Sequence, residues 1–243
     1  MTAEGEFGMS AFDDPLFLPG EFLGKVRVFP LPNLVLFPHV MQPLRVFEAR
    51  YRELLEDALA GDGLIAMAAL APGWEKDYEG RPALYPIACL GRITAHCRLP
   101  DGAYNVLLLG LQRVRLLREL PFTRPFREAE AELCEDLCPV HSSAKRKVVR
   151  QELREAISQV LPALPEAQEQ LDQLLGNDMP LGVLTDVMGY ILDIGTRQKL
   201  SLLAEMNIVR RAELLLKHLS EAGSQSPPLE APAGCFPPEF SMN

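Results

Sequence analysis

The side chains best suited to acid–base chemistry are scattered along the chain instead of being gathered in one motif. The sequence has four histidines, His39, His96, His141 and His218. His39 lies in a proline-flanked loop where a base could act, although an ordinary half-buried loop histidine fits the same pattern. His96 lies inside an alternating run, as a packed strand residue does. The histidines by themselves therefore predict no active site.

Motifs that bind phosphate or carry a catalytic serine are missing from the sequence. No segment contains Gly-Lys-Ser or Gly-Lys-Thr, the end of the backbone cradle that holds nucleotide phosphates. No Gly-x-Ser-x-Gly elbow presents a nucleophilic serine, and no Ser–Lys or Ser–His–Asp arrangement is recognisable. We therefore predict that the protein is not an enzyme, has neither ATPase nor peptidase activity, and needs no cofactor.

The cysteines raise the question of a metal site. There are five, Cys89, Cys97, Cys134, Cys138 and Cys235. Cys134, Cys138 and His141 could supply part of a zinc site, but a structural zinc ion takes four ligands, usually from two closely spaced pairs. The second pair is missing, so we predict no metal. Reduced thiols are expected because the cysteines are odd in number and the chain is long and expected not to be secreted.

A basic stripe stands at the start of a segment with helical spacing. Its members are Lys145, Arg146, Lys147, Arg150 and Arg154. Positive charge at a helix start opposes the helix dipole. Three interpretations stay open: a solvated helix face, a partner for the acidic pair Glu135-Asp136, or a docking site for an acidic protein.

The composition is that of an ordinary globular protein with an excess of acid. The 243 residues are 48% hydrophobic and carry 33 acidic against 24 basic side chains, a net charge of −9. Nucleic-acid binding needs a basic surface, so a nucleic-acid partner is disfavoured. No run of about eighteen apolar residues predicts a membrane span. The acidic stretch before Lys25 is the reverse of a signal peptide, so we expect a cytoplasmic protein.

The first half of the chain predicts strands around one helix. Short apolar runs interrupted by proline suit the edges and corners of a barrel. Residues 48–60 switch to helical spacing, with an apolar stripe that ends at Gly61. Farther along, Pro100-Asp101-Gly102 separates two long β-rich runs and predicts a hairpin turn. We therefore predict five or six strands in a compact, partly closed barrel with one short helix.

Beyond the barrel, apolar residues recur with a helical period. Five helices are expected, around Val149–Val160, Pro165–Leu175 and Leu181–Ile191, from Thr196 onward, and around Ile208–Leu219. Ser142 or Ser143 would cap the first and Thr196 the fourth. Short connections predict antiparallel packing in a bundle. The fold class is α+β: a β-barrel followed by a C-terminal α-helical bundle.

These patterns divide the chain into four parts. We expect a flexible N-terminal arm over 1–24, the barrel over 25–138, the helical bundle over 139–222, and a disordered proline-rich tail over 223–243. The barrel and the bundle are expected to unfold as one body.

Several separate segments resemble the N-terminal substrate-binding domain of the ATP-dependent protease Lon. They include Phe29-Pro30-Leu31-Pro32 running into Leu36-Phe37-Pro38, then Pro43-Leu44 followed by Phe47-Glu48-Ala49-Arg50-Tyr51. Further matches occur at 90–93, 100–106, 110–114, 184–186 and 199–203, in the family's order. The resemblance spans about Val26 to Leu219. It implies a PUA-like β-barrel that forms one Lon N-terminal-type domain with the bundle, as in stand-alone bacterial Lon-domain proteins without ATPase or protease domains.

The resemblance also implies recognition of polypeptides instead of catalysis. We predict a non-catalytic module of protein quality control that binds unfolded or exposed polypeptide segments, as an adaptor or modulator of proteolysis with a Lon-type protease as partner. The candidate binding residues lie in one apolar, proline-stiffened loop: Phe37, Pro38, His39, Val40, Met41 and Pro43. Methionine repacks readily around varied partners.

Two alternatives stay open beside this prediction. Val40 and Met41 would be structural if they plugged the mouth of the barrel. A small-molecule- or RNA-binding PUA-like protein is the alternative function, although the acidic balance and the lack of an aromatic–basic cluster count against RNA.

Overall fold

Six strands form one sheet in the first half of the chain. They are β1 (Lys25–Leu31), β2 (Met41–Val46), β3 (Leu64–Ala69), β4 (Ile87–Arg98), β5 (Tyr104–Glu119) and β6 (Arg127–Cys134). The computed structural model describes residues 22–78, 80–138, 143–160 and 179–223. The chain divides into two compact units at the junction of Cys134 and Glu135. The predicted arm and tail lie outside the described residues, except for 22–24 and Gly223.

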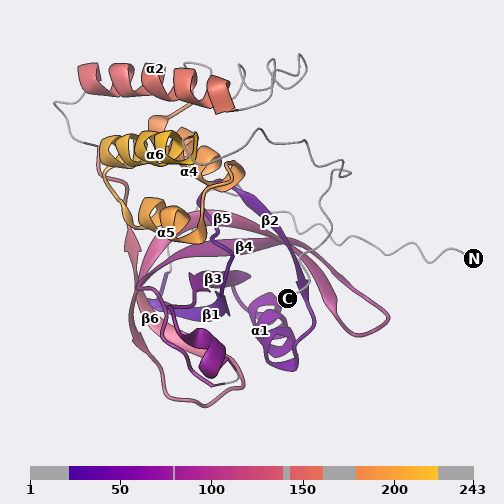
Figure 1. Ribbon diagram of the computed structural model, residues 1–243. Helices are drawn as coiled ribbons and strands as arrows, with labels where there is room; N and C mark the ends of the chain where they lie inside the picture. Colours follow the sequence, from indigo (N-terminus) through magenta and orange to yellow (C-terminus); the bar gives the residue numbers. More distant parts are fainter. Residues whose placement is uncertain (1–21, 79, 139–142, 161–178, 224–243) are drawn as a thin grey trace, which may run out of the picture. The chain divides into compact units, whose positions relative to one another are not determined.

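The sheet closes into a barrel. The strand order is β2-β5-β4-β3-β1-β6, and β5 pairs with β6 as well, so that β1, β3, β4, β5 and β6 form a ring (Figure 1). Only β1 and β3 run parallel; the other pairs are antiparallel. β2 pairs with the first half of β5 and stands outside the ring. The predicted barrel of five or six strands is confirmed.

The predicted hairpin turn joins β4 to β5. The N–H of Leu99 donates to the carbonyl oxygen of Ala103 at 2.8 Å, and the Asp101 carboxylate accepts from the Ala103 N–H at 3.0 Å. Gly102 has φ +81°, a left-handed conformation that glycine adopts without strain. The Pro-Asp-Gly pattern therefore predicted this turn correctly.

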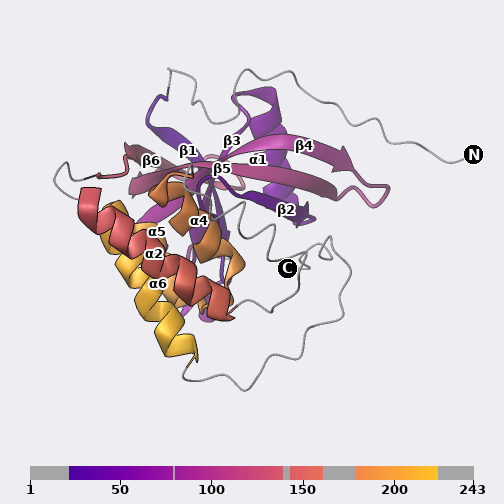
Figure 2. The same cartoon turned by 90° about the horizontal axis from the view of Figure 1, so that it is seen from above.

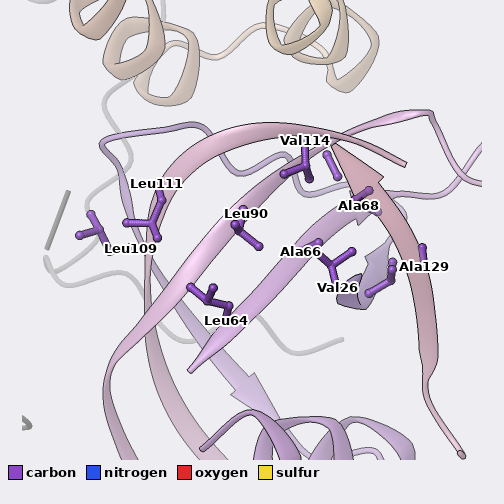
Figure 3. Packing of buried hydrophobic residues seen from close by; sticks show 12 residues of the cluster. Val26, Leu64, Ala66, Ala68, Leu90, Leu109, Leu111, Val114 and Ala129 are labelled. Atoms are coloured by element: carbon purple, nitrogen blue, oxygen red, sulfur yellow. The ribbon is translucent and has the colours of Figure 1, made fainter. Parts of the chain in front are cut away.

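Two apolar layers stabilise the barrel unit. Small and branched side chains from the five ring strands fill the interior, among them Val26, Ala66, Leu90, Val114 and Ala129 (Figure 3). On the other face, the helix α1 (Ala49–Ala60) buries Tyr51, Leu54, Leu55 and Ala58. All six residues of β3 are buried because this strand contributes to both layers.

The second unit is helical. It contains α2 (Ser143–Val160), α4 (Leu181–Ile191), α5 (Thr196–Ala204) and α6 (Ile208–Gly223). α2 and α6 lie side by side (Figure 2), and α4 also contacts α5 and α6. The predicted helix around Pro165–Leu175 lies outside the described residues. Thr196 is the first residue of α5, and Gly195 occupies the capping position that the sequence suggested for Thr196.

The described residues contain no helix both long and apolar enough to cross a membrane.

Candidate functional site

The predicted binding segment, residues 37–43, contains both buried and exposed side chains. Phe37 is completely buried, Pro38 and Val40 are buried, and His39 is half-buried. Met41 exposes 48% of its surface, and Pro43 is half-buried. Only part of the segment can therefore touch a partner without a change in structure, and polypeptide binding by these residues stays a prediction.

A close approach to β5 explains why Phe37 to Val40 turn inward. The N–H of His39 donates to the Gly110 carbonyl oxygen, and the N–H of Gly110 donates to the Val40 carbonyl oxygen, both at 2.8 Å. A side chain at position 110 would collide with the carbonyl oxygen of Phe37, so only glycine permits this contact. His39 has φ +65°, which is uncommon for a residue with a side chain.

The sequence analysis placed Met41 and Pro43 in a loop, and that placement was wrong. Both belong to β2, which pairs with β5 from Met41 opposite Leu109 to Val46 opposite Tyr104. Gln42, Leu44 and Val46 are buried whereas the residues between them are not. The apolar-polar-apolar order of Leu44, Arg45 and Val46 is a signal for a strand, but Met41 and Gln42 reverse it because apolar Met41 is exposed and polar Gln42 is buried.

A shallow hollow lies beside β2. Its lining includes Phe29 and Leu31 of β1, Leu44 to Glu48, and Tyr51 of α1. Phe47, which the sequence analysis did not select, exposes 45% of its surface at this hollow. Met41 and Phe47 thus present two apolar side chains at the two ends of β2.

The charges around the hollow are paired with each other. Arg45 binds Asp101 at 2.7 Å, and Arg50 binds Glu48 at 2.9 Å. The hydroxyl of Tyr78 donates to Glu48 at 2.8 Å. Burial and this hydrogen bond raise the pKa of Tyr78, so the phenol keeps its proton. These pairings leave apolar contact as the main chemistry that the surface offers.

A larger cavity of about 390 Å³ lies elsewhere in the barrel unit. Its lining includes Phe22 and Leu23, three basic residues and three carboxylates. Arg27 donates to Asp57 at 2.5 Å and to Asp62 at 2.7 Å, while Arg124 also binds Asp57. Burial by itself would raise the pKa of Asp57, but the hydrogen bonds from Arg27 and Arg124 outweigh it and lower that pKa. The cavity is large enough for a small molecule.

The helical unit contains a serine–histidine–glutamate series that the sequence analysis missed. The Ser201 oxygen lies 3.0 Å from Nε2 of His218, and Nδ1 of His218 lies 3.4 Å from Glu221. The Ser201 hydroxyl also lies 2.7 Å from the Gln198 carbonyl oxygen, which competes with His218 for its proton. It also lies inside α5, where helical hydrogen bonds occupy the amides that an oxyanion hole would need. The geometry supports no hydrolytic site.

Among the described residues, neither the cysteines nor the basic stripe forms a recognisable site. Within the described ranges, no group of three His, Cys, Asp or Glu side chains could hold a metal ion; His141 lies outside them. In the stripe, Lys145 pairs with Glu213, Arg146 donates to the sulfur of Cys138, and Arg150 donates to the Met179 carbonyl.

The fold and its motifs define a class of protein. The family model of the ATP-dependent protease La (LON) substrate-binding domain matches residues 25–221. The chain belongs to this family, which confirms the resemblance seen in its sequence. The family's domain serves substrate recognition and is non-catalytic.

Two curated relatives illustrate the match. The Lon protease of Cytophaga hutchinsonii is 25% identical over 200 residues, which cover 81% of this chain and 24% of the relative. Lon protease 2 of Syntrophobacter fumaroxidans is 34% identical over 109 residues, which cover 44% of this chain and 13% of the relative. The match thus spans about a quarter or less of these proteases.

Two solved structures share the fold. A Lon N-terminal domain protein from Xanthomonas campestris aligns with TM-score 0.55 and 24% identity, over 79% of this chain and 97% of its own. The N-terminal domain of the Mycobacterium avium complex Lon protease aligns with TM-score 0.66 and 17% identity, over 81% and 98%.

Proposed function

We propose that the protein binds unfolded or exposed polypeptide segments at the surface formed by Met41, Pro43 and Phe47. One observation carries the proposal: Met41 and Phe47 are exposed apolar side chains at the two ends of β2, Phe47 lines a hollow, and the charges around that hollow are paired. Apolar side chains of an unfolded protein gain free energy by leaving water for such a surface. Membership of the Lon substrate-binding family supports the same function.

We further propose that the protein acts as an adaptor or modulator of proteolysis in the cytoplasm, with a Lon-type protease as a partner. It performs no chemistry of its own in this role. Incubation of the purified protein with ATP and casein should therefore yield neither phosphate release nor peptide fragments. ATP-dependent cleavage by a contaminant-free preparation would contradict this part of the proposal.

Binding is tested with fluorescently labelled β-casein, an unfolded protein, by fluorescence anisotropy. Met41→Asp should weaken binding about tenfold, because the new charge must lose water without gaining a partner. Leu117→Asp is the matched control, since Leu117 is an exposed aliphatic residue of β5 in the same unit, 56% exposed. Equal affinities of the wild type and Met41→Asp would refute the proposed site.

The cavity beside Asp57 favours a second candidate function, the binding of a small polar molecule. Its volume and its balance of basic and acidic side chains support this alternative. A screen of zwitterionic metabolites by thermal shift tests it. A ligand that stabilises the wild type but not Asp57→Asn would favour this function over polypeptide binding.

A further inference from the structure

β2 is an edge strand whose second side is open to hydrogen bonding. It stands at the end of the sheet order, and among the described residues β5 is its sole strand partner. The direction of its backbone groups can be deduced from β5. The Ala103 carbonyl faces β4 and the Gly110 groups face β2, so the even-numbered residues of this part of β5 bond to β2.

The residues of β2 that face outward follow from this register. Gln42, Leu44 and Val46 lie opposite even-numbered residues of β5 and bond to them. The N–H and carbonyl groups of Met41 and Arg45, and the carbonyl of Pro43, therefore point away from β5. Proline at position 43 fits this assignment because it has no N–H to lose on an open edge.

Met41 and Arg45 each offer both an outward N–H donor and an outward carbonyl acceptor on this edge. The Gln42 side chain donates to the Pro43 carbonyl at 2.8 Å and so occupies the middle position. In the described ranges, the outward backbone groups of Met41 and Arg45 form no hydrogen bond. They are four residues apart, about 13 Å along a strand, and each presents one N–H and one carbonyl. The backbone of another extended segment has the same spacing and could form four hydrogen bonds with these two N–H and two carbonyl groups.

The side chains at the edge restrict the chemistry of the occupant. Met41 and Phe47 are exposed and apolar, and the charge of Arg45 is neutralised by Asp101. A segment with charged residues facing this edge would lose hydration without gaining an ion pair. The complementary occupant is an extended polypeptide with low charge and apolar or β-branched residues.

We propose that the protein binds polypeptides by strand addition: an extended, low-charge segment pairs with the outward backbone groups of Met41 and Arg45 on β2. This inference rests on the proposed function and adds the mode of recognition. Backbone pairing would supply affinity that is largely independent of sequence, and the apolar contacts would select against charged segments.

The test compares two substitutions at one position. Arg45→Pro removes the outward N–H and leaves the bonds to β5 in place, whereas Arg45→Ala removes the same side chain and keeps the N–H. The probe is an eight-residue peptide of alternating valine and threonine with a lysine at each end, measured by calorimetry. The peptide should bind Arg45→Pro about tenfold more weakly than Arg45→Ala.

A second measurement needs no variant of the protein. N-methyl groups are placed on alternate residues of the peptide, in either of the two registers. One register blocks the edge that pairs with β2 and should reduce binding about tenfold or more, while the other should bind like the unmodified peptide. This contrast holds even if Arg45→Pro fails to fold.

The outcomes separate the inference from the proposed function. If neither the unmodified peptide nor β-casein binds the wild type, the proposed function fails and the inference with it. If β-casein binding depends on Met41 but neither Arg45→Pro nor N-methylation matters more than its control, strand addition alone is overturned. A wild-type dimer that Arg45→Pro dissociates would show that a second copy occupies the edge, which also overturns the inference.

Discussion

The two units differ in the kind of side chain that occupies their interior. The barrel unit fills its centre with apolar side chains, and its strands are held together by backbone hydrogen bonds in a fixed register. The helical unit instead has a charged residue at its centre. Arg211 of α6 is completely buried, as are Thr185 and Asp186 of α4.

The buried guanidinium links three separate parts of the helical unit. It donates to Asp136 at 2.5 and 2.8 Å, to Thr185 at 3.0 Å, and to the Glu205 carbonyl at 2.9 Å, with Asp186 at 3.4 Å. Helices satisfy their own backbone groups, so side chains must determine how they pack. Strands exchange backbone bonds and need no such centre. The difference predicts where each unit should be most sensitive to mutation.

The largest effect is expected from Arg211→Ala. Removing the guanidinium breaks the buried ion pair between Arg211 and Asp186, and breaking a buried ion pair in this way costs about 3–5 kcal/mol. Arg210→Ala, at the neighbouring exposed position, should change the free energy of unfolding by less than about 0.5 kcal/mol. Urea denaturation of both variants measures the contrast, and equal stabilities would refute the central role of Arg211.

In the barrel the corresponding change is Leu90→Ala. Leu90 is completely buried in the interior, and truncation of such a residue costs about 2–5 kcal/mol through lost contacts and a cavity. Leu117→Ala, on the exposed part of β5, should cost less than about 1 kcal/mol. A small loss for Leu90→Ala would mean that the interior collapses around the cavity.

The same two variants show whether the units unfold together. The sequence predicts one cooperative body, and this stays a prediction beside the division of the chain into two compact units. Calorimetry should then show a single transition that both Arg211→Ala and Leu90→Ala shift downward. Two transitions, each shifted by one variant only, would establish independent domains.

A smaller and pH-dependent effect is expected from Asp57→Asn in the barrel. The pKa of Asp57 is lower in the folded protein than its ordinary value of 3.8, so its charge stabilises the fold above that pH. The advantage of the wild type, about 1 kcal/mol near pH 7, should shrink as the pH falls below 4, as Asp57 takes up a proton. Glu53→Gln on the exposed face of α1 is the control. A difference that stays constant from pH 7 to pH 3 would exclude this origin.

The smallest effect on stability is expected from Met41→Asp. An exposed side chain tolerates substitution within about 1 kcal/mol, so this variant should melt close to the wild type while losing affinity for unfolded protein. A large loss of melting temperature would instead show that Met41 belongs to the core. Thermal melts beside Leu117→Asp separate the two cases.

Local patterns in the sequence determined much of the architecture. The apolar stripe of 48–60 predicted α1, and the Pro-Asp-Gly sequence predicted the turn between β4 and β5, since both depend on neighbours within a few residues. The separate Lon-like segments predicted the family. After Ser142 the apolar residues recur with helical spacing, and this change predicted the helical unit.

Only the tertiary structure decided which residues of the candidate segment are exposed. Phe37 and Met41 are equally apolar in sequence, but contact with Gly110, about seventy residues away, buries the first and leaves the second on an edge strand. Arg211 likewise finds Asp136 across 75 positions. The spacing of apolar residues indicates which face of one helix or strand is buried. The burial and pairing of an individual side chain depend on segments that meet only when the chain has folded.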